Sequence, residues 1–221
     1  MADKPSFNVI FDPWIPVETT NGTIEMVGIR KILQNAHNYR KVSIASPLFS
    51  YGVQRVLIAF LIDAFPPKDV DELCELIGQG RFDSNRIDDY IEECRKDGEC
   101  FDLFDLERPF MQTVFNCEED KEDNIVRIFP EWPEGNNHVH FNHAKEDSHQ
   151  FTPAECARAL CALPAFAMNY GRSTMFGLNG IPPIYLLHAG KNLFETFALS
   201  MVTESEYSTI DFNDPPIAWR D

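Results

Sequence analysis

One long apolar segment, residues 46–67, most constrains how this chain can fold. Ser46 is typical of a helix N-cap, and Pro47 follows at the first helical position, where its missing N–H costs nothing. Pro66 and Pro67 then stop the helix. The apolar residues between these signals recur at helical spacing, so we predict a long core helix built on Leu48, Phe49, Val53, Val56, Leu57, Phe60 and Leu61.

This segment does not match a membrane span. Its longest apolar run, residues 56–65, contains Asp63 and falls far short of the ~20 residues that a transmembrane helix needs. The start of the chain does not match a signal peptide. The 221 residues include six cysteines, none of them in a C-x-x-C pair, which indicates a reducing compartment. We therefore expect a cytoplasmic protein with no membrane partner.

The sequence before this helix begins with β structure. We predict a strand at 7–11 and a hairpin at 17–26, in which Asn21-Gly22 favours a type I′ turn. A short helix is expected at 28–36. Together with the core helix, these elements predict an α+β fold in which an N-terminal β hairpin packs on several helices.

The later helices are marked by their start and stop signals. We predict acidic amphipathic helices at 69–77 and 85–95, ended by Gly78 and Gly98. Thr152 and Glu155 form a capping box. From this capping box we predict a helix to about residue 163, where Pro164 ends or kinks it. We also predict strands at 125–129 and 184–188, and a helix at 192–202.

Two long irregular segments, 109–150 and 168–183, interrupt these elements. Loops longer than ~12 to 15 residues in a compact domain are usually functional or disordered. The first loop is rich in His and Asn without low-complexity character, and the second carries three glycines. We predict that both are functional loops.

The charge distribution bears on the class of partner. A net charge of −16 argues at first sight against nucleic acid, because phosphate contacts need Lys and Arg. Most of this charge lies in 69–124, which has 19 acidic and six basic residues, whereas 26–62 has no acid. The candidate polyanion-facing residues are the bases of 26–62, although charge patterning alone favours an ordinary solvated face: Arg30, Lys31, Arg40, Lys41 and Arg55.

The residues favour neither a metal site nor an enzyme. His138, His140, His143 and His149 are close in sequence, but no cysteine pair supplies the other half of a tetrahedral zinc site. There is no G-x-S-x-G, H-E-x-x-H, P-loop or G-x-G-x-x-G motif. We expect solvated loop histidines, no cofactor and no catalytic residues.

Four strings identify a resemblance. FDPWIPV at 11–17, RPFMQT at 108–113, PEGNNHVHFNH at 133–143 and FTPAECARAL at 151–160 occur in that order. Together they resemble the CasA family, the large subunits of type I-E CRISPR Cascade complexes, over residues 6–202. The resemblance implies that residues 1–221 form the N-terminal domain of such a subunit, with an ordered core at about 6–202.

The resemblance implies a nucleic-acid-binding subunit rather than an enzyme. In such complexes the guide RNA reads the sequence by base pairing, while protein reads a short adjacent motif. The implied function is to recognise that motif in duplex DNA, help separate the strands and help recruit a nuclease in antiviral defence. The implied partners are the guide RNA, target double-stranded DNA, other Cascade subunits, and a helicase-nuclease effector or fused nuclease module.

The resemblance also assigns candidate binding residues. The loop at 135–143 is expected to contact the guide RNA, and the loop at 169–180 to approach the target duplex. Relatives often have consecutive glycines at the start of the second loop, so here Arg172 is expected to substitute as a side-chain contact. The guide-RNA set is Asn136, Asn137, His138, Phe141 and His143, and the DNA set is Asn169, Gly171, Arg172, Asn179 and Gly180.

Alternatives stay open at this stage. Family chains continue into a C-terminal helical bundle, whereas this sequence stops at Asp221. It is a truncated form, the ordered part of a longer chain, or part of a variant with another module, such as an HNH nuclease, beyond Asp221. Other interpretations are metal-dependent hydrolysis at the histidine loop, or a structural subunit that caps the assembly through its acidic helices without touching DNA.

Overall fold

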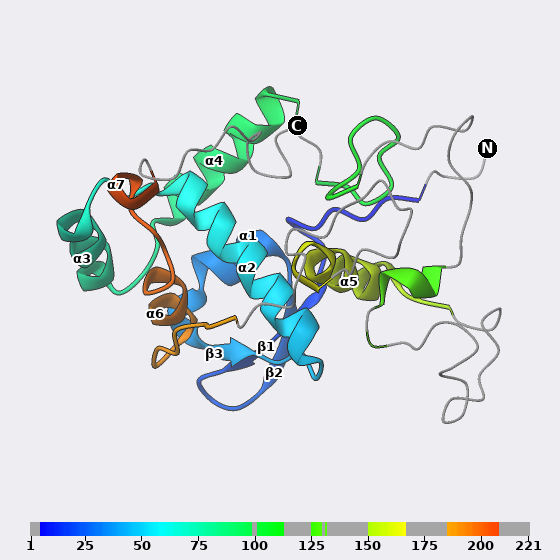
Figure 1. Cartoon of the computed structure of the whole chain (residues 1–221), viewed down its shortest axis with the longest axis horizontal. Helices are drawn as coiled ribbons and strands as arrows, with labels where there is room; N and C mark the ends of the chain where they lie inside the picture. The colour runs from blue at the N-terminus through cyan, green and yellow to red at the C-terminus, as the bar shows by residue number, and fades with distance from the viewer. Residues whose placement is uncertain are drawn as a thin grey trace.

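The computed structural model describes residues 5–98, 101–112, 125–129, 131, 150–166 and 185–207. They form an α+β fold in which a small antiparallel sheet lies beside a group of helices (Figure 1). The elements are β1 (Ile15–Thr19), β2 (Ile24–Val27), α1 (Ile29–Gln34), η1 (Ala36–Asn38), β3 (Tyr39–Val42), α2 (Pro47–Ala64), α3 (Val70–Gln79), α4 (Ser84–Lys96), η2 (Ile125–Ile128), α5 (Pro153–Phe166), α6 (Leu193–Ala198) and α7 (Glu204–Tyr207).

The predicted hairpin is confirmed, but its turn differs from the prediction. The sheet has the order β2-β1-β3, with Ile15 opposite Val27 in the antiparallel hairpin. The Thr19 N–H donates to the Thr23 carbonyl, and the Gly22 N–H donates to the Thr19 carbonyl, each at 2.9 Å. These two bonds close a three-residue loop at 20–22. Only Gly22 in this loop has a positive φ, +81°, so the turn is not type I′. The glycine at the third loop position favours this longer loop over a two-residue turn.

The strand predicted at 7–11 is wrong. Asn8 makes one isolated bridge to Asp102, and the chain then turns sharply, because the Asn8 carbonyl accepts hydrogen bonds from the N–H groups of Phe11 and Asp12. The Asp12 carboxylate accepts a bond of 2.6 Å from the Asn8 N–H, which reinforces the turn. The carbonyls exposed by this turn, those of Val9 and Ile10, accept from the first N–H groups of α1.

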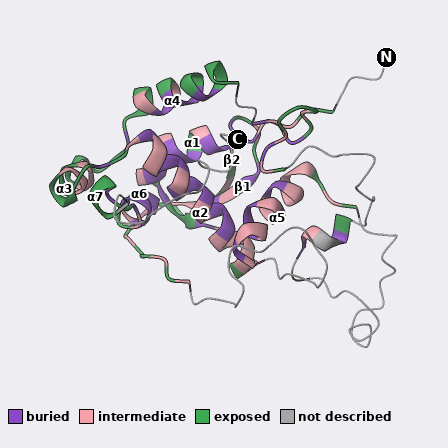
Figure 2. Cartoon of the chain, turned by 45° about the horizontal axis from the view of Figure 1, so that its top comes forward, coloured by how far each residue is buried: buried purple, intermediate pink, exposed green. Residues whose placement is uncertain are grey.

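The long helix α2 is confirmed as the core helix. Ser46 caps it by accepting a hydrogen bond of 3.2 Å from Phe49 N–H. Its buried residues contact the rest of the core (Figure 2). Helix α5 crosses α2 at Gly52, where an added Cβ would lie 2.6 Å from the Cα of Ala162. Among the described residues, α2 is the one helix long and apolar enough to cross a membrane by length and composition. Its packing identifies it as the centre of the fold instead.

The acidic helices are confirmed as α3 and α4. Asp69 caps α3 and Asp83 caps α4, each through its side chain. Gly98 follows α4 with φ +86°, as its predicted role requires. The end of α3 is corrected: Gly78 lies inside the helix, and Gly80 adopts the left-handed conformation with φ +71°.

Four other expectations are corrected. Residues 125–128 form the 3-10 helix η2, closed by a hydrogen bond from Phe129 N–H to Val126 O, rather than a strand. Residues 185–188 have no regular structure, because Tyr185 packs through its ring instead of pairing its backbone in a sheet.

Helix α5 continues past Pro164 to Phe166, since a proline in the last turn removes only one backbone bond. Helix α6 ends at Ala198, where Ser200 and Met201 turn back to donate to Phe197 and Ala198.

Candidate nucleic-acid interface

All the candidate binding residues lie outside the described residues. Both sets, the guide-RNA residues of 136–143 and the DNA residues of 169–180, belong to segments 132–149 and 167–184. The structure does describe the residues that flank each segment. We therefore describe the candidate interface through the residues at which each segment leaves the core and returns to it.

The segment with the guide-RNA residues leaves and returns through stacked aromatic rings. The rings of Phe129 and Phe151 lie 3.9 Å apart between centroids and are nearly parallel, at 21°. Phe49 of α2 meets Phe129 edge-on at 5.9 Å. Phe129 is 4% exposed, so this contact is part of the core. We call these three residues, Phe49, Phe129 and Phe151, the first root.

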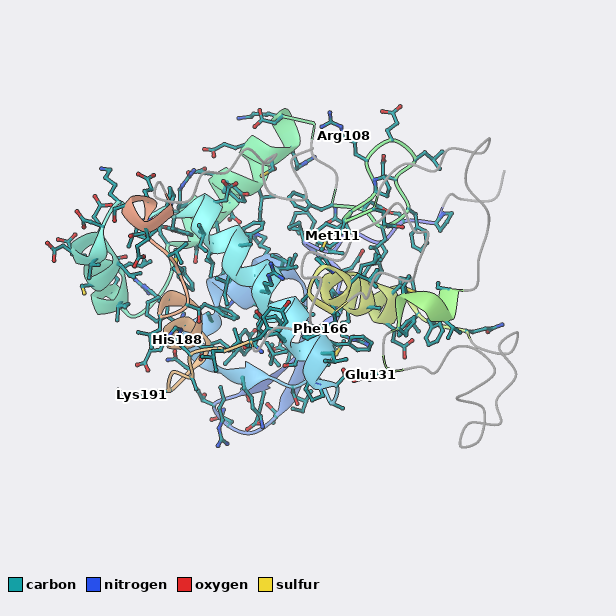
Figure 3. The ribbon with its side chains drawn as sticks, in the orientation of Figure 1. Arg108, Met111, Glu131, Phe166, His188 and Lys191 are labelled. Carbon is teal, nitrogen blue, oxygen red and sulfur yellow. The ribbon has the colours of Figure 1, made fainter. Side chains whose placement is uncertain are left out.

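Two polar contacts hold the same end of the molecule. Ser46, the N-cap of α2, donates a side-chain hydrogen bond to the Glu131 carboxylate, which places a negative charge at a helix N-terminus (Figure 3). The predicted capping box at the start of α5 is confirmed by a 2.7 Å bond from Thr152 N–H to Glu155 and a 3.3 Å bond from Glu155 N–H to the Thr152 hydroxyl. The Thr152 backbone bond is the main cause that lowers the pKa of Glu155.

The segment with the DNA residues has a second root, made of Tyr51, Phe166 and Tyr185. Tyr51 of α2 lies 5.7 Å from Phe166 and 4.5 Å from Tyr185, between ring centroids. Phe166 and Tyr185 meet edge-on at 5.3 Å, and the Tyr185 hydroxyl donates to Ala165 O at 2.8 Å. Figure 3 shows Phe166 beside the N-terminal part of α2, near Glu131. The two ends of the 167–184 segment are thus held together on α2.

Both roots are attached to one turn of one helix. Phe49 and Tyr51 are two residues apart in α2, and residues at that spacing point to nearly opposite sides of a helix. The first root therefore lies on one flank of the α2 N-terminal turn, and the second root lies on the other. The ring contacts of both roots were not predicted from the sequence, although Phe129 and Phe151 flank the first loop in the sequence.

The acid-free stretch is less available to polyanions than its sequence indicates. Arg30 forms a bidentate pair with Asp88 at 2.6 and 2.8 Å, and this is the main cause that lowers the pKa of Asp88. Lys31 pairs with Glu25, while Arg40 and Lys41 both pair with Glu18 at 3.1 and 3.2 Å. Neighbouring strands and helices supply these acids, so sequence proximity alone could not show the pairing.

Three of the four strings that carry the resemblance contain residues that build the scaffold. Phe110 is 2% exposed, and Gln112 donates to Leu103 O at 3.0 Å. Arg158, in the fourth string, donates to the carbonyl of Trp14, in the first, at 2.6 Å and is partly buried. The strings at 11–17, 108–113 and 151–160 thus include residues that fold the core.

The described residues contain no group of three or more His, Cys, Asp or Glu side chains placed to hold a metal ion. The four loop histidines lie outside this part of the chain. Burial raises the pKa of the Cys156 and Cys161 thiols, which disfavours the thiolate that a nucleophile needs.

Comparisons with known proteins agree with this fold. A family model described as CRISPR-associated protein Cse1 matches residues 8–221. A curated CasA/Cse1 protein of Thermus thermophilus is 32% identical over 209 residues, 91% of this chain and 41% of the relative. The crystal structure of Thermobifida fusca Cse1 superposes with a TM-score of 0.76 at 25% identity, over 98% of this chain and 43% of that one.

A third relative has been solved within an assembly. A chain of a structure titled "CRISPR RNA-guided surveillance complex" has the same fold, with a TM-score of 0.70 at 22% identity, over 89% of this chain and 44% of that one. The chain spans less than half the length of each of these relatives. From the match over residues 8–221 and the shared fold, the chain belongs to the CRISPR-associated Cse1 (CasA) family.

Proposed function

We propose that this chain is a nucleic-acid-binding part of a CRISPR RNA-guided surveillance complex. In this role it recognises the motif adjacent to the target in duplex DNA and helps to separate the strands. It acts by binding rather than by catalysis, in the cytoplasm. Its partners are guide RNA, target DNA, the other subunits of the complex, and a nuclease that is recruited or fused.

The observation that carries the proposal is the family match, which runs through both loop segments. The relative solved in a surveillance complex shares the fold in which these segments are rooted. The residues that flank both segments pack on or beside the N-terminal turn of α2 through aromatic contacts, which supports the proposal. That arrangement suits a subunit that contacts two nucleic acids on the two flanks of one helix end.

The test is reconstitution of the complex from this protein, the other subunits and a guide RNA. Target binding is then measured on duplexes that match the guide and differ only in the adjacent motif. We expect the chain to co-purify with the guide complex and to raise affinity for duplexes with the correct motif at least tenfold. Unchanged affinity with and without the chain would contradict motif recognition and would favour a structural capping subunit.

A further inference from the structure

Arg55 differs from the other bases of the acid-free stretch. Residues 26–62 are all described, and four of their five Lys and Arg side chains form ion pairs with acids. Arg55, in the third turn of α2, forms no ion pair in the described structure. No acid among the described residues therefore neutralises its positive charge.

The guanidinium of Arg55 is also left with an unsatisfied donor. Its Nη1 atom is buried and has no hydrogen-bond partner. An arginine cannot escape this cost by losing its proton, because a guanidinium stays protonated in proteins. Burying a charged donor without a partner is unfavourable, so a native protein that retains one needs an explanation.

The position of Arg55 points to the second root. It lies one helical turn after Tyr51, whose ring packs on Phe166 and Tyr185. Burial raises the pKa of Tyr51, and the nearby positive charge of Arg55 partly opposes this rise. Arg55, which has no ion pair among the described residues, thus adjoins the aromatic contacts at both ends of the 167–184 segment.

We propose that Arg55 binds a phosphate of the target DNA backbone beside the second root. The inference rests on the proposed function, because it assigns a contact to the same interface. A guanidinium presents several N–H donors in a planar fork that matches phosphate oxygens. Arginine beside aromatic rings is a common surface for nucleic acid. Because Nη1 is buried, this contact requires the Arg55 side chain to turn outward.

The test compares Arg55→Gln, Arg55→Lys and a matched control, Arg40→Gln, in the reconstituted complex. Arg40 is an exposed base of the same stretch that is already paired with Glu18. Target affinity is measured over a series of salt concentrations. For Arg55→Gln we expect about tenfold weaker binding, and a slope of log K against log salt that is shallower by about 0.9, the value of one phosphate contact. Arg55→Lys retains most of the slope, and Arg40→Gln retains both slope and affinity.

Stability gives an independent check. Because Arg55 has no partner in the described structure, Arg55→Gln should leave the melting temperature of the protein unchanged or raise it. A clear fall would reveal a partner within the chain and overturn the proposal.

Three other outcomes decide the matter. An unchanged salt slope for Arg55→Gln would overturn the phosphate contact while leaving the proposed function intact. Loss of the chain from the complex, with normal target binding by the fraction that assembles, would overturn it in favour of a carboxylate on another subunit. If the wild-type complex bound no target, the proposed function would fall, and this inference with it.

Discussion

Phe141 is the residue whose role the sequence and the resemblance describe most differently. A bulky aromatic after a run of Gly, Asn and His residues is normally buried or stacked. If buried, Phe141 anchors the loop to the core, whereas the resemblance assigns it to stacking on guide RNA. We predict that Phe141→Ala barely changes the melting temperature of the isolated chain and weakens incorporation into the guide complex about ten- to a hundredfold, since stacking on a base is worth ~1–3 kcal/mol. A destabilised variant that assembles normally would refute the RNA contact.

Gly180 offers a matching prediction for DNA. A glycine permits close approach of the backbone to a ligand, which a larger side chain prevents. We expect Gly180→Leu to weaken target binding at least tenfold and to leave guide assembly unchanged. The measurement is target affinity of the assembled complex, with Gly78→Leu as a control for a glycine replacement, because a Cβ at Gly78 in α3 meets nothing within 4 Å. Normal target affinity for Gly180→Leu would count against its placement.

Single residues were predictable where a local rule decides their conformation. The Ser46 cap, the Thr152 capping box and the helix stop at Gly98 all depend on neighbours within a few positions. The bridge of Asn8 to Asp102 and the pairing of Arg30 with Asp88 depend on partners that only the fold brings near. The ring contacts of Tyr51 belong to this second kind.

At the scale of elements, the crossing of α2 and α5 depends on the absence of a side chain at Gly52. A Cβ there would meet backbone atoms of Cys161 and Ala162 at 2.6 Å. We predict that Gly52→Ala destabilises the protein by about 1–3 kcal/mol, as overpacking does. The control is Gly78→Ala in α3, where a Cβ meets nothing within 4 Å and should stabilise the helix by ~0.5–1 kcal/mol. Thermal unfolding measures both, and equal shifts would contradict the close crossing.

The first root gives a prediction that separates positioning from stability. Phe151→Leu retains an apolar side chain but removes the ring stacked on Phe129, at a cost of about 0.5–1.5 kcal/mol. We expect up to tenfold weaker guide incorporation with unchanged target binding by assembled complexes. Phe151→Tyr, which keeps the ring, should restore incorporation. Equal loss in both variants would indicate that the stack does not position the loop.

The elements themselves were predicted well where periodicity and caps coincide, as in α2, α3, α4 and α5. The failures were short apolar runs. Residues 125–129 and 185–188 have strand-like composition, but their rings pack on α2 instead of joining the sheet. Neither helical period nor strand alternation can be established over four or five residues.

For the whole molecule, ion pairs make stability depend on acid. Arg30 lowers the pKa of Asp88, Lys31 that of Glu25, and Lys41 that of Glu18, each below its unfolded value. These pairs therefore stabilise the fold above about pH 4, and their contribution is lost as the pH falls through the lowered pKa values. We predict a melting temperature that falls between about pH 5 and pH 3, with a smaller fall in Asp88→Asn. An identical pH profile for that variant would contradict the role of the Arg30 pair.

The sharing of one helical turn by the two roots has a consequence for regulation. A change in the tilt of the α2 N-terminus would reach Phe49 and Tyr51 together, so the loops cannot be repositioned independently through that helix. If such a tilt accompanies guide binding, it alters affinity for the target, and thermodynamic linkage requires target binding to alter guide affinity by the same factor. The N-terminal turn of α2 is thus the place in this chain where two ligands would become coupled.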